Sequence, residues 1–194
     1  MNGFRREQTE IRDLIVNQGI VENSVDEMLY RPRRQATDLY LLAGPILGNV
    51  GPASCVVYPK AAGSAQSGRG DFMLPSGLWL SGNVSVDLVW SGTVASAITN
   101  VQWIISVSVS AIGAVPANIG SYSYAAPGPG TINALMRTSF PNHAGNAPVP
   151  WPITGASVLV GINIGRQAAL GTDTYLGDVN LFSYQLIYTP AKGH

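Results

Sequence analysis

Few side chains in this sequence have the type and spacing that catalysis requires. His143 is the one histidine before the terminal His194, and its neighbours in SFPNHAGNAPVPWP are those of a turn. No serine lies in a Gly-x-Ser-x-Gly motif, and no glycine-rich loop joins a strand pattern to a helical one. Asp87 could take part in glycoside hydrolysis only with a second carboxylate, whose distance is left open. We therefore expect no catalytic residue and no enzyme activity, with a small glycan-active enzyme as the least favoured alternative.

Metal and cofactor chemistry has equally little support. Asp173 and Asp178 flank the turn GTDTYLGD, but this turn lacks the dense alternating carboxylates of a calcium loop. We expect a hairpin whose aspartates bond their own backbone, and an ion pair of Arg166 with one of them. The single cysteine, Cys55, excludes an intrachain disulfide and a cysteine zinc site. These patterns predict no metal and no cofactor.

The aromatic side chains are better candidates for a functional site than the catalytic and metal-binding patterns, because they could contact a ligand or a partner. Trp90 and Trp103 are in phase with the apolar positions of two strand patterns, so we expect them in the core. Four residues in or beside predicted turns are candidates for surface contact with a glycan or a protein: Tyr122, Tyr124, His143 and Trp151. The tripeptide Arg69-Gly70-Asp71 spells an integrin-recognition motif, but three-residue motifs arise by chance, and Asp71 also suits the start of a strand.

Charge is concentrated at the amino terminus. Thirteen of the 22 charged side chains lie in residues 1–38, and only five lie in residues 72–191. A body with so little charge is expected to cover much of its surface with neighbouring protein. A net charge of zero argues against a general nucleic-acid binder, and no window has the pattern of a membrane span or a signal peptide. We expect an arm and strap over residues 1–54, a body over residues 55–194, and a homo-oligomer.

Residues 4–30 carry a helical period that has two interpretations. In one heptad frame the a and d positions are apolar except for Gln18, and they would form a short coiled-coil seam: Ile11, Leu14, Val21, Val25 and Met28. Alternatively, Gly19 ends a first helix, and a capping box over residues 24–27 opens a second. Either amphipathic piece is too short to be stable alone, so we expect it to need a partner surface.

Residues 31–53, with the sequence RPRRQATDLYLLAGPILGNVGPA, follow the helical region. Their prolines and glycines predict an extended apolar strap that is neither helix nor strand. Three arginines lie at its start, and we expect them to contact the same partner surface as the helical region: Arg31, Arg33 and Arg34. Residues 61–70, AAGSAQSGRG, have the composition of a linker.

The body has the pattern of a sheet protein. Apolar and polar residues alternate over residues 84–90 and 101–111, apolar residues line one face of residues 156–164, and residues 178–188 carry large side chains on both faces of a strand pattern. Weaker strand patterns cover 55–58, 71–74, 121–125 and 131–137. No helical period separates these segments, so a parallel βαβ arrangement is not expected. The pattern predicts a mainly β fold, namely a jelly-roll-like antiparallel β-sandwich with an amino-terminal helical arm and an extended strap.

The carboxy-terminal run WPITGASVLVGINIGRQAALGTDTYLGDVNLFSYQLIYTP resembles the last two strands of jelly-roll modules on virions of tailed bacteriophages. Those modules occur in head fibres, capsid decoration proteins and the tips of tail needles and fibres. The resemblance covers mainly residues 84–190 and consists of a strand pattern rather than a set of functional residues. In that group a short amino-terminal segment anchors the protein to the particle, and the sandwich forms trimers.

The resemblance implies a non-enzymatic virion structural protein, made in the host cytoplasm and located on the virion. It would dock through its amino-terminal arm on other virion proteins, such as the major capsid protein, and project a trimeric sandwich as a capsid decoration or head fibre. The alternative is a receptor- or glycan-binding tip of a tail appendage, whose partner is a host surface glycan. Neither nucleic acid nor membrane is an expected partner.

Overall fold

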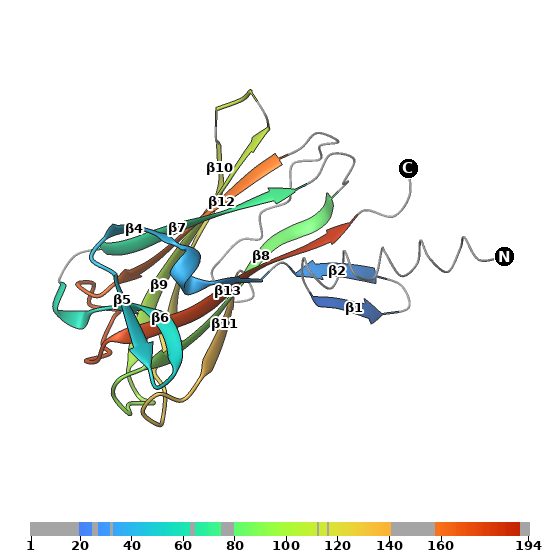
Figure 1. Cartoon of the computed structure of the whole chain (residues 1–194). Coiled ribbons are helices and arrows are strands. Elements are labelled where there is room, and N and C mark those ends of the chain that lie inside the picture. Colours follow the sequence, from blue (N-terminus) through green and yellow to red (C-terminus); the bar gives the residue numbers. More distant parts are fainter. Residues whose placement is uncertain are drawn as a thin grey trace.

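In the computed structural model, the chain folds into two antiparallel β-sheets that pack face to face (Figure 1). The structure describes residues 20–24, 27–31, 33–62, 65–74, 80–111, 113–115, 117–140 and 158–190. The mainly β, antiparallel sandwich predicted for this sequence is confirmed. No helix among the described residues has the length and apolar character needed to cross a membrane.

One sheet has five strands. Their order is β10 (Ala117–Pro127), β9 (Asn100–Ala111), β12 (Val158–Gln167), β7 (Ala65–Leu74) and β4 (Tyr40–Ala43). The other sheet has eight strands and is organised around β13 (Val179–Pro190). Strand β13 pairs with β2 (Glu27–Arg31), β3 (Arg33–Gln35), β6 (Ala53–Tyr58) and β8 (Leu80–Gly92), while β1 (Ile20–Ser24), β5 (Ile46–Val50) and β11 (Met136–Phe140) extend it through β2, β6 and β8. Two short 3-10 helices, η1 (Ala36–Asp38) and η2 (Lys60–Ala62), lie between strands.

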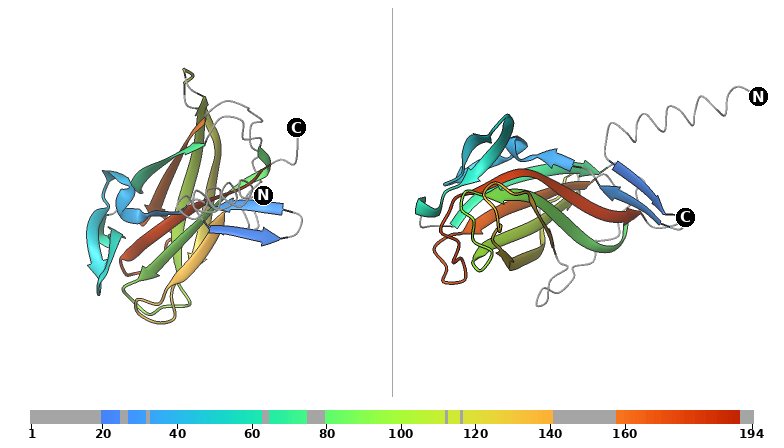
Figure 2. Two further views of the ribbon diagram at one scale, coloured as in Figure 1. Left: turned by 45° about the vertical axis from the view of Figure 1, so that its right-hand side comes forward. Right: turned by 90° about the horizontal axis from the view of Figure 1, so that it is seen from below.

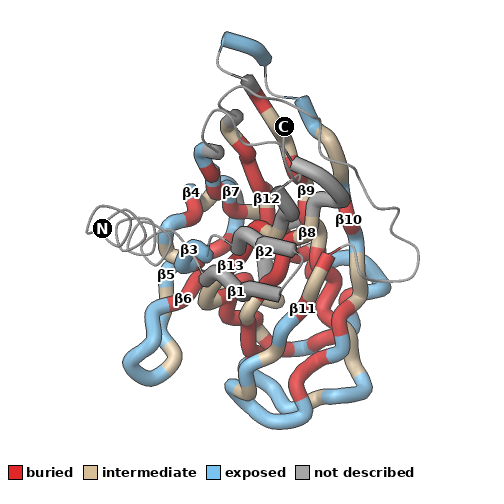
Figure 3. The backbone as a smooth tube through the Cα atoms, turned by 90° about the vertical axis from the view of Figure 1, so that its right-hand side faces the viewer, coloured by how far each residue is buried: buried red, intermediate tan, exposed pale blue. Residues whose placement is uncertain are grey.

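Strand alternation sorts the side chains of the five-stranded sheet into two faces. On β9, Val101, Trp103, Ile105 and Val107 are fully buried, whereas Ile104, Ser106 and Ser108, which point to the other face, are partly exposed. Register pairs Ile105 with Ile164 of β12, so the apolar faces of neighbouring strands coincide. This face packs on the eight-stranded sheet. On the opposite face Ser106 and Asn163 are partly exposed and Arg69 is exposed, and Figure 3 colours the chain by this burial.

Aromatic rings fill the space between the sheets. Trp103 makes edge contacts with Trp90 and Tyr58, with ring centroids 5.8 Å and 5.5 Å apart. Trp90 Nε1 donates a hydrogen bond to Thr138 Oγ1 at 2.9 Å, which satisfies its buried polar group. The predicted core positions of Trp90 and Trp103 are therefore confirmed.

The helical structure predicted for residues 4–30 is wrong where the structure describes this segment, at residues 20–24 and 27–30. Strands β1 and β2 form an antiparallel hairpin there, and Ser24 pairs with Glu27 across the connection instead of opening a capping box. The hairpin lies beside β13, where Tyr30 pairs with Tyr188, and it thus extends the eight-stranded sheet. The two views of Figure 2 place this hairpin and the β5–β6 pair at opposite ends of the sandwich. The rest of the predicted arm, including Ile11, Leu14 and Val25, lies outside the described residues.

The predicted strap over residues 31–53 is also wrong. Its residues form β3, β4 and β5, which pair with β13, β7 and β6. An apolar segment has to pair its backbone N–H and C=O groups, and the open edges of both sheets provide those partners. The predicted domain boundary between residues 54 and 55 falls inside β6.

Residues 65–70 of the predicted linker belong to strand β7. The glycines that suggested a linker have a packing role, because Gly68 and Gly70 face the core. A Cβ atom on Gly70 would overlap the hydroxyl of Tyr184, and one on Gly68 would lie 3.3 Å from Leu39. Composition suggested flexibility where the sandwich needs room for large side chains from the other sheet.

Candidate functional site

The outer face of the five-stranded sheet carries a line of polar side chains that crosses all five strands. Successive register pairs join them, so they lie side by side on one face. We call these five residues the polar row: Ser121 on β10, Ser106 on β9, Asn163 on β12, Arg69 on β7 and Tyr40 on β4. Neighbouring strands are about 4.8 Å apart, a spacing similar to the length of one sugar ring.

A second group of polar atoms meets above Gly161, next to Asn163 on β12. A Cβ atom at Gly161 would lie 2.6 Å from Ser108 Oγ and 3.1 Å from both Arg69 Nη2 and Asp71 Oδ1. Register places Ser108 and Asp71 on either side of this glycine. The absence of a side chain at Gly161 therefore lets a donor and two acceptors from neighbouring strands converge on one spot of the open face.

The hydrogen bonds within this face leave much of its capacity unused. Ser106 Oγ and Ser121 Oγ are 3.1 Å apart, and Arg69 Nε donates to Asp71 Oδ1 at 3.3 Å. Asn163 Oδ1 is buried, yet it accepts no hydrogen bond. A buried polar atom without a partner costs free energy, and a ligand donor would recover that cost.

Charge and exposure at this face suit a soluble polar ligand. The side chains of Arg69 and Asp71 are 43% and 46% exposed, so their ion pair is screened by water and can exchange partners. The Tyr40 ring, 73% exposed at the edge of the sheet, gives the row a flat apolar surface at one end. Within the described residues, no three His, Cys, Asp or Glu side chains are grouped as a metal site would require.

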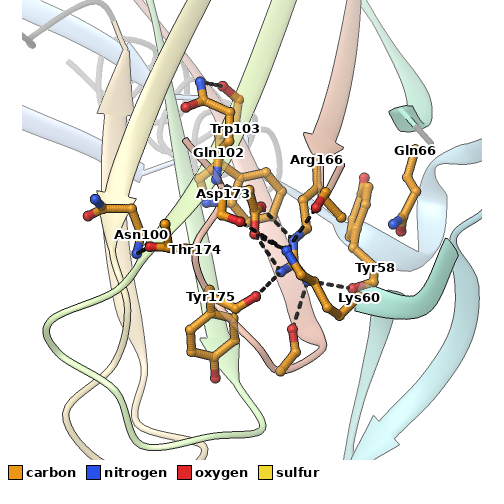
Figure 4. Close-up of polar contacts among 12 residues, drawn as sticks. Tyr58, Lys60, Gln66, Asn100, Gln102, Trp103, Arg166, Asp173, Thr174 and Tyr175 are labelled. Atoms are coloured by element: carbon orange, nitrogen blue, oxygen red, sulfur yellow. Dashed lines mark hydrogen bonds and ion pairs between the residues drawn. The ribbon is translucent and has the colours of Figure 1, made fainter. Parts of the chain in front are cut away.

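The most densely bonded polar group of the described chain is buried instead (Figure 4). Arg166 and Asp173 are both fully buried, with Arg166 Nε 2.9 Å from Asp173 Oδ2 and Arg166 Nη2 3.0 Å from Asp173 Oδ1. The other guanidinium bonds go to the carbonyl oxygens of Tyr58, Gly177 and Tyr175. The predicted pairing of Arg166 with an aspartate of the turn is confirmed, and its bonds tie the β12–β13 loop to β6.

Lys60 completes this buried group. Its Nζ donates to the carbonyl oxygens of Ala168 and Asp173 at 2.8 Å and 2.9 Å, and to Asp173 Oδ1 at 3.1 Å. Burial by itself raises the pKa of Asp173. Hydrogen bonds from Arg166, from the Gln102 N–H and from Lys60, with the Arg166 charge, outweigh burial and lower that pKa below its usual range. The group is structural, because every strong donor in it is already used.

The structure separates the residues that were predicted to make surface contacts. Tyr122 is 1% exposed and belongs to the core, so its prediction as a surface contact is wrong: its register partner is Ile105, on the inward face. Tyr124 is half-buried, with its ring edge-on to Phe140 at 6.3 Å. His143 and Trp151 lie outside the described residues.

The predicted anchoring residues within the described chain lie on the strands of the eight-stranded sheet. Val21 is on β1, Met28 and Arg31 are on β2, and Arg33 and Arg34 are exposed on β3. The Arg34 guanidinium lies 5.6 Å from the centroid of the Phe72 ring, so it covers the side of the core. Their role in docking stays a prediction.

Asp87 lies on the eight-stranded sheet, away from the polar row. Arg137 donates to its Oδ2 through Nε, at 2.8 Å, and through Nη2. The carboxylate is therefore bonded to a cation, and no second carboxylate of the described chain pairs with it.

Sequence reasoning missed the polar row because its members come from five separate segments. A signal was present in Ser106 and Ser108, which occupy the polar phase of β9, and in Gly161 and Asn163, which occupy the same phase of β12. Only the register shows that these positions are neighbours.

Comparison with known proteins gives the fold a context. No family model matches the chain, and no curated protein matches its sequence. A structure of isomalto-dextranase from Arthrobacter globiformis, complexed with panose, matches 80% of this chain at a TM-score of 0.50 and 14% identity, and this chain spans 23% of that one.

Two carbohydrate-binding modules are similar at a lower level. One is a family 35 module from Clostridium thermocellum (TM-score 0.45, 13% identity, 80% of this chain and 96% of that one). The other is CsCBM6-3 from Clostridium stercorarium, in complex with cellobiose (TM-score 0.44, 12% identity, 82% and 93%). At such identities the likeness concerns the fold alone, which is that of a two-sheet sandwich.

Proposed function

We propose that this protein is a non-catalytic glycan-binding sandwich whose ligand lies across the polar row. The observation that carries the proposal is the continuous line of polar side chains over all five strands, with Asn163 Oδ1 buried and unbonded within it. A face of this kind fits an extended, hydroxyl-rich ligand, because each sugar ring would meet a new strand and a new hydrogen-bonding group.

The chemistry of the row matches that of an uncharged sugar. A sugar hydroxyl both donates and accepts, and the face offers a donor in Arg69, an acceptor in Asp71 and serines that do either. The Tyr40 ring would stack on the apolar side of one ring. Among the described residues, Asp71 is the one carboxylate at the Gly161 cluster, whereas glycoside hydrolysis needs a pair, so we assign binding without cleavage. The fold likeness to part of an enzyme solved with panose is in keeping with this ligand class.

Titration calorimetry against a panel of neutral oligosaccharides tests the proposal. We expect one class to bind, and Arg69→Ala to weaken binding about tenfold to a hundredfold, since a hydrogen bond to a charged group contributes about 1.5–3 kcal/mol. Arg33→Ala is the matched control, because Arg33 is exposed on β3 of the other sheet and should leave the affinity unchanged. Absence of binding across the panel, or equal losses in both variants, would contradict the proposal.

The role as a virion structural protein, anchored through residues 1–54, stays a prediction. The observation in its favour is the scarcity of charge over residues 72–191, which suits a chain packed among other proteins. Labelling the protein with a specific antibody and examining purified phage particles by electron microscopy tests it. Unlabelled particles would rule this role out and leave the glycan-binding proposal intact.

A further inference from the structure

Two consecutive strands of the chain, β4 and β5, each form an outer edge of one of the two sheets. Strand β4 is the outermost strand of the five-stranded sheet, and β5 follows it directly and is an outermost strand of the eight-stranded sheet. Gly44, with φ of +79°, and Pro45 carry the chain from one sheet to the other. Figure 1 shows both strands on the side of the molecule away from the β1–β2 hairpin. This side is therefore defined by two open strand edges.

The geometry of the β5–β6 hairpin shows which backbone groups face outward. Val50 pairs with Ala53 around Gly51 and Pro52, and Gly51 has a φ of +58°, as in a type II′ turn. Residues that flank such a two-residue turn exchange hydrogen bonds, and the pattern then alternates along the strand. Leu47 and Asn49 consequently direct their N–H and C=O groups away from β6, to the open edge.

Strand β5 carries no charged residue, no internal proline and no bulge that would oppose pairing with another chain. Natural edge strands commonly carry lysine, an internal proline or a bulge. Here no charged residue occurs between Leu39 and Pro59, and the register of β5 with β6 is regular throughout. Leu42, Ile46 and Leu47 are large apolar side chains that remain mostly exposed, at 65% for Leu47.

We propose that β5 pairs with β5 of a second copy of this chain, antiparallel and about a two-fold axis at Gly48. In that register Leu47 of each copy lies opposite Asn49 of the other, so the outward N–H and C=O groups of both residues are used. An edge strand is complementary to itself in this arrangement, and an uncharged segment in a chain of zero net charge does not repel its copy. The two eight-stranded sheets would join into one, and the assembly closes at two subunits.

Light scattering coupled to size exclusion tests the proposal with three variants. The wild-type chain should have twice the monomer mass of 20.4 kDa. Leu47→Lys should be a monomer, because it places a charge at the edge. Asn49→Pro should also be a monomer, since it removes an outward N–H while the bonds between β5 and β6 remain. Ile98→Lys, at an apolar side chain that is 95% exposed in the turn between β8 and β9, is the matched control and should remain a dimer.

Circular dichroism of each variant would establish that it is folded before its mass is compared. A dimer that only Leu47→Lys and Asn49→Pro dissociate would support the proposal. A wild-type monomer or trimer would overturn it, as would a folded Asn49→Pro dimer or dissociation by Ile98→Lys. The measured mass also separates this dimer from the trimer that the phage resemblance predicts.

Discussion

Two Arg–Asp pairs on neighbouring strands of one sheet have opposite physical roles. Arg166 on β12 points into the sandwich and is fully buried with Asp173, whereas Arg69 on β7 lies on the outer face and shares solvent with Asp71. The Arg166 guanidinium makes five hydrogen bonds, to a carboxylate and three carbonyl groups. Arg69 donates to Asp71 through Nε.

The difference follows from the cost of removing charge from water. A buried guanidinium must have an acceptor for each N–H, because unsatisfied charge in the core costs several kcal/mol. A half-exposed guanidinium meets that need with water, and a ligand can replace the water. The Arg166–Asp173 pair, whose donors are all bonded within the protein, therefore stabilises the fold. The Arg69–Asp71 pair, which is bonded partly to water, is the one available for recognition.

The largest effect should come from breaking the buried pair. Arg166→Met leaves the Asp173 carboxylate in the core without its main partner, and we expect a loss of about 3–5 kcal/mol in the free energy of unfolding. Urea denaturation measures the change. The double variant Arg166→Met with Asp173→Leu removes both charges and should recover a large part of the loss. If the double variant were as unstable as the sum of the single ones, the two residues would not act as a pair.

Low pH should also weaken the buried pair, and we expect a smaller loss of folding stability from it than from Arg166→Met. The pKa of Asp173 is lowered in the folded protein, so its contribution to stability is present above the unfolded pKa of about 3.9 and disappears as the pH falls through the lower folded pKa. Urea midpoints measured from pH 6 to pH 2 should decline more steeply in this acid range for the wild type than for Asp173→Asn. Parallel pH profiles would show that the Asp173 charge does not stabilise the fold.

On the outer face of the five-stranded sheet, the addition of one methyl group at Gly161 tests the proposed binding site. Gly161→Ala would place its Cβ where Ser108, Arg69 and Asp71 meet, so these side chains must separate. We expect glycan affinity to fall several-fold, about 1 kcal/mol. Gly171→Ala is the matched control, because its Cβ would have no neighbour within 4 Å. An unchanged affinity would mean that the Gly161 cluster is not part of the binding site.

The smallest effect on stability should come from the exposed pair. Asp71→Asn removes the charge of a pair that is nearly half exposed. We expect the free energy of unfolding of this variant to match that of the wild type within about 0.5 kcal/mol. Differential scanning calorimetry at low and high salt provides the measurement. A loss of several kcal/mol would show that this pair also supports the fold, and it would remove the contrast with Arg166 and Asp173.

The sequence predicts the sandwich well where strands have one buried face. Residues 101–111 alternate except at Ile104, and β9 spans 100–111, because the same alternation that marks the pattern also sorts the side chains between core and solvent. The predicted strand over 131–137 is displaced: β11 begins at Met136, and Asn133 has a φ of 59°, which suits a turn. Element type was thus better predicted than element boundaries.

Prediction failed where pairing, rather than pattern, decides the structure. The stretches around Leu41 and Gly68 have the composition of loops, but they pair with each other as β4 and β7, and β7 also pairs with β12. The polar row was beyond reach for the same reason, because the register that aligns Asn163 with Ser106 and Arg69 is a tertiary property. The alternation of apolar and polar residues also failed to show that Tyr122 is buried. Strand β10 lies at the edge of its sheet, and its alternation is weak.

The Lys60 ammonium group occupies a position in the β12–β13 loop that the oxygen atoms of this loop could otherwise offer to a free cation. Two carbonyl groups and one carboxylate oxygen surround its amine, an arrangement in which a loop could also hold a free cation. An ammonium group on the same polypeptide is present at a fixed and high effective concentration, whatever the composition of the medium. The order of this loop is therefore set by covalent connectivity, and neither a chelating agent nor a change of dissolved cations should alter it.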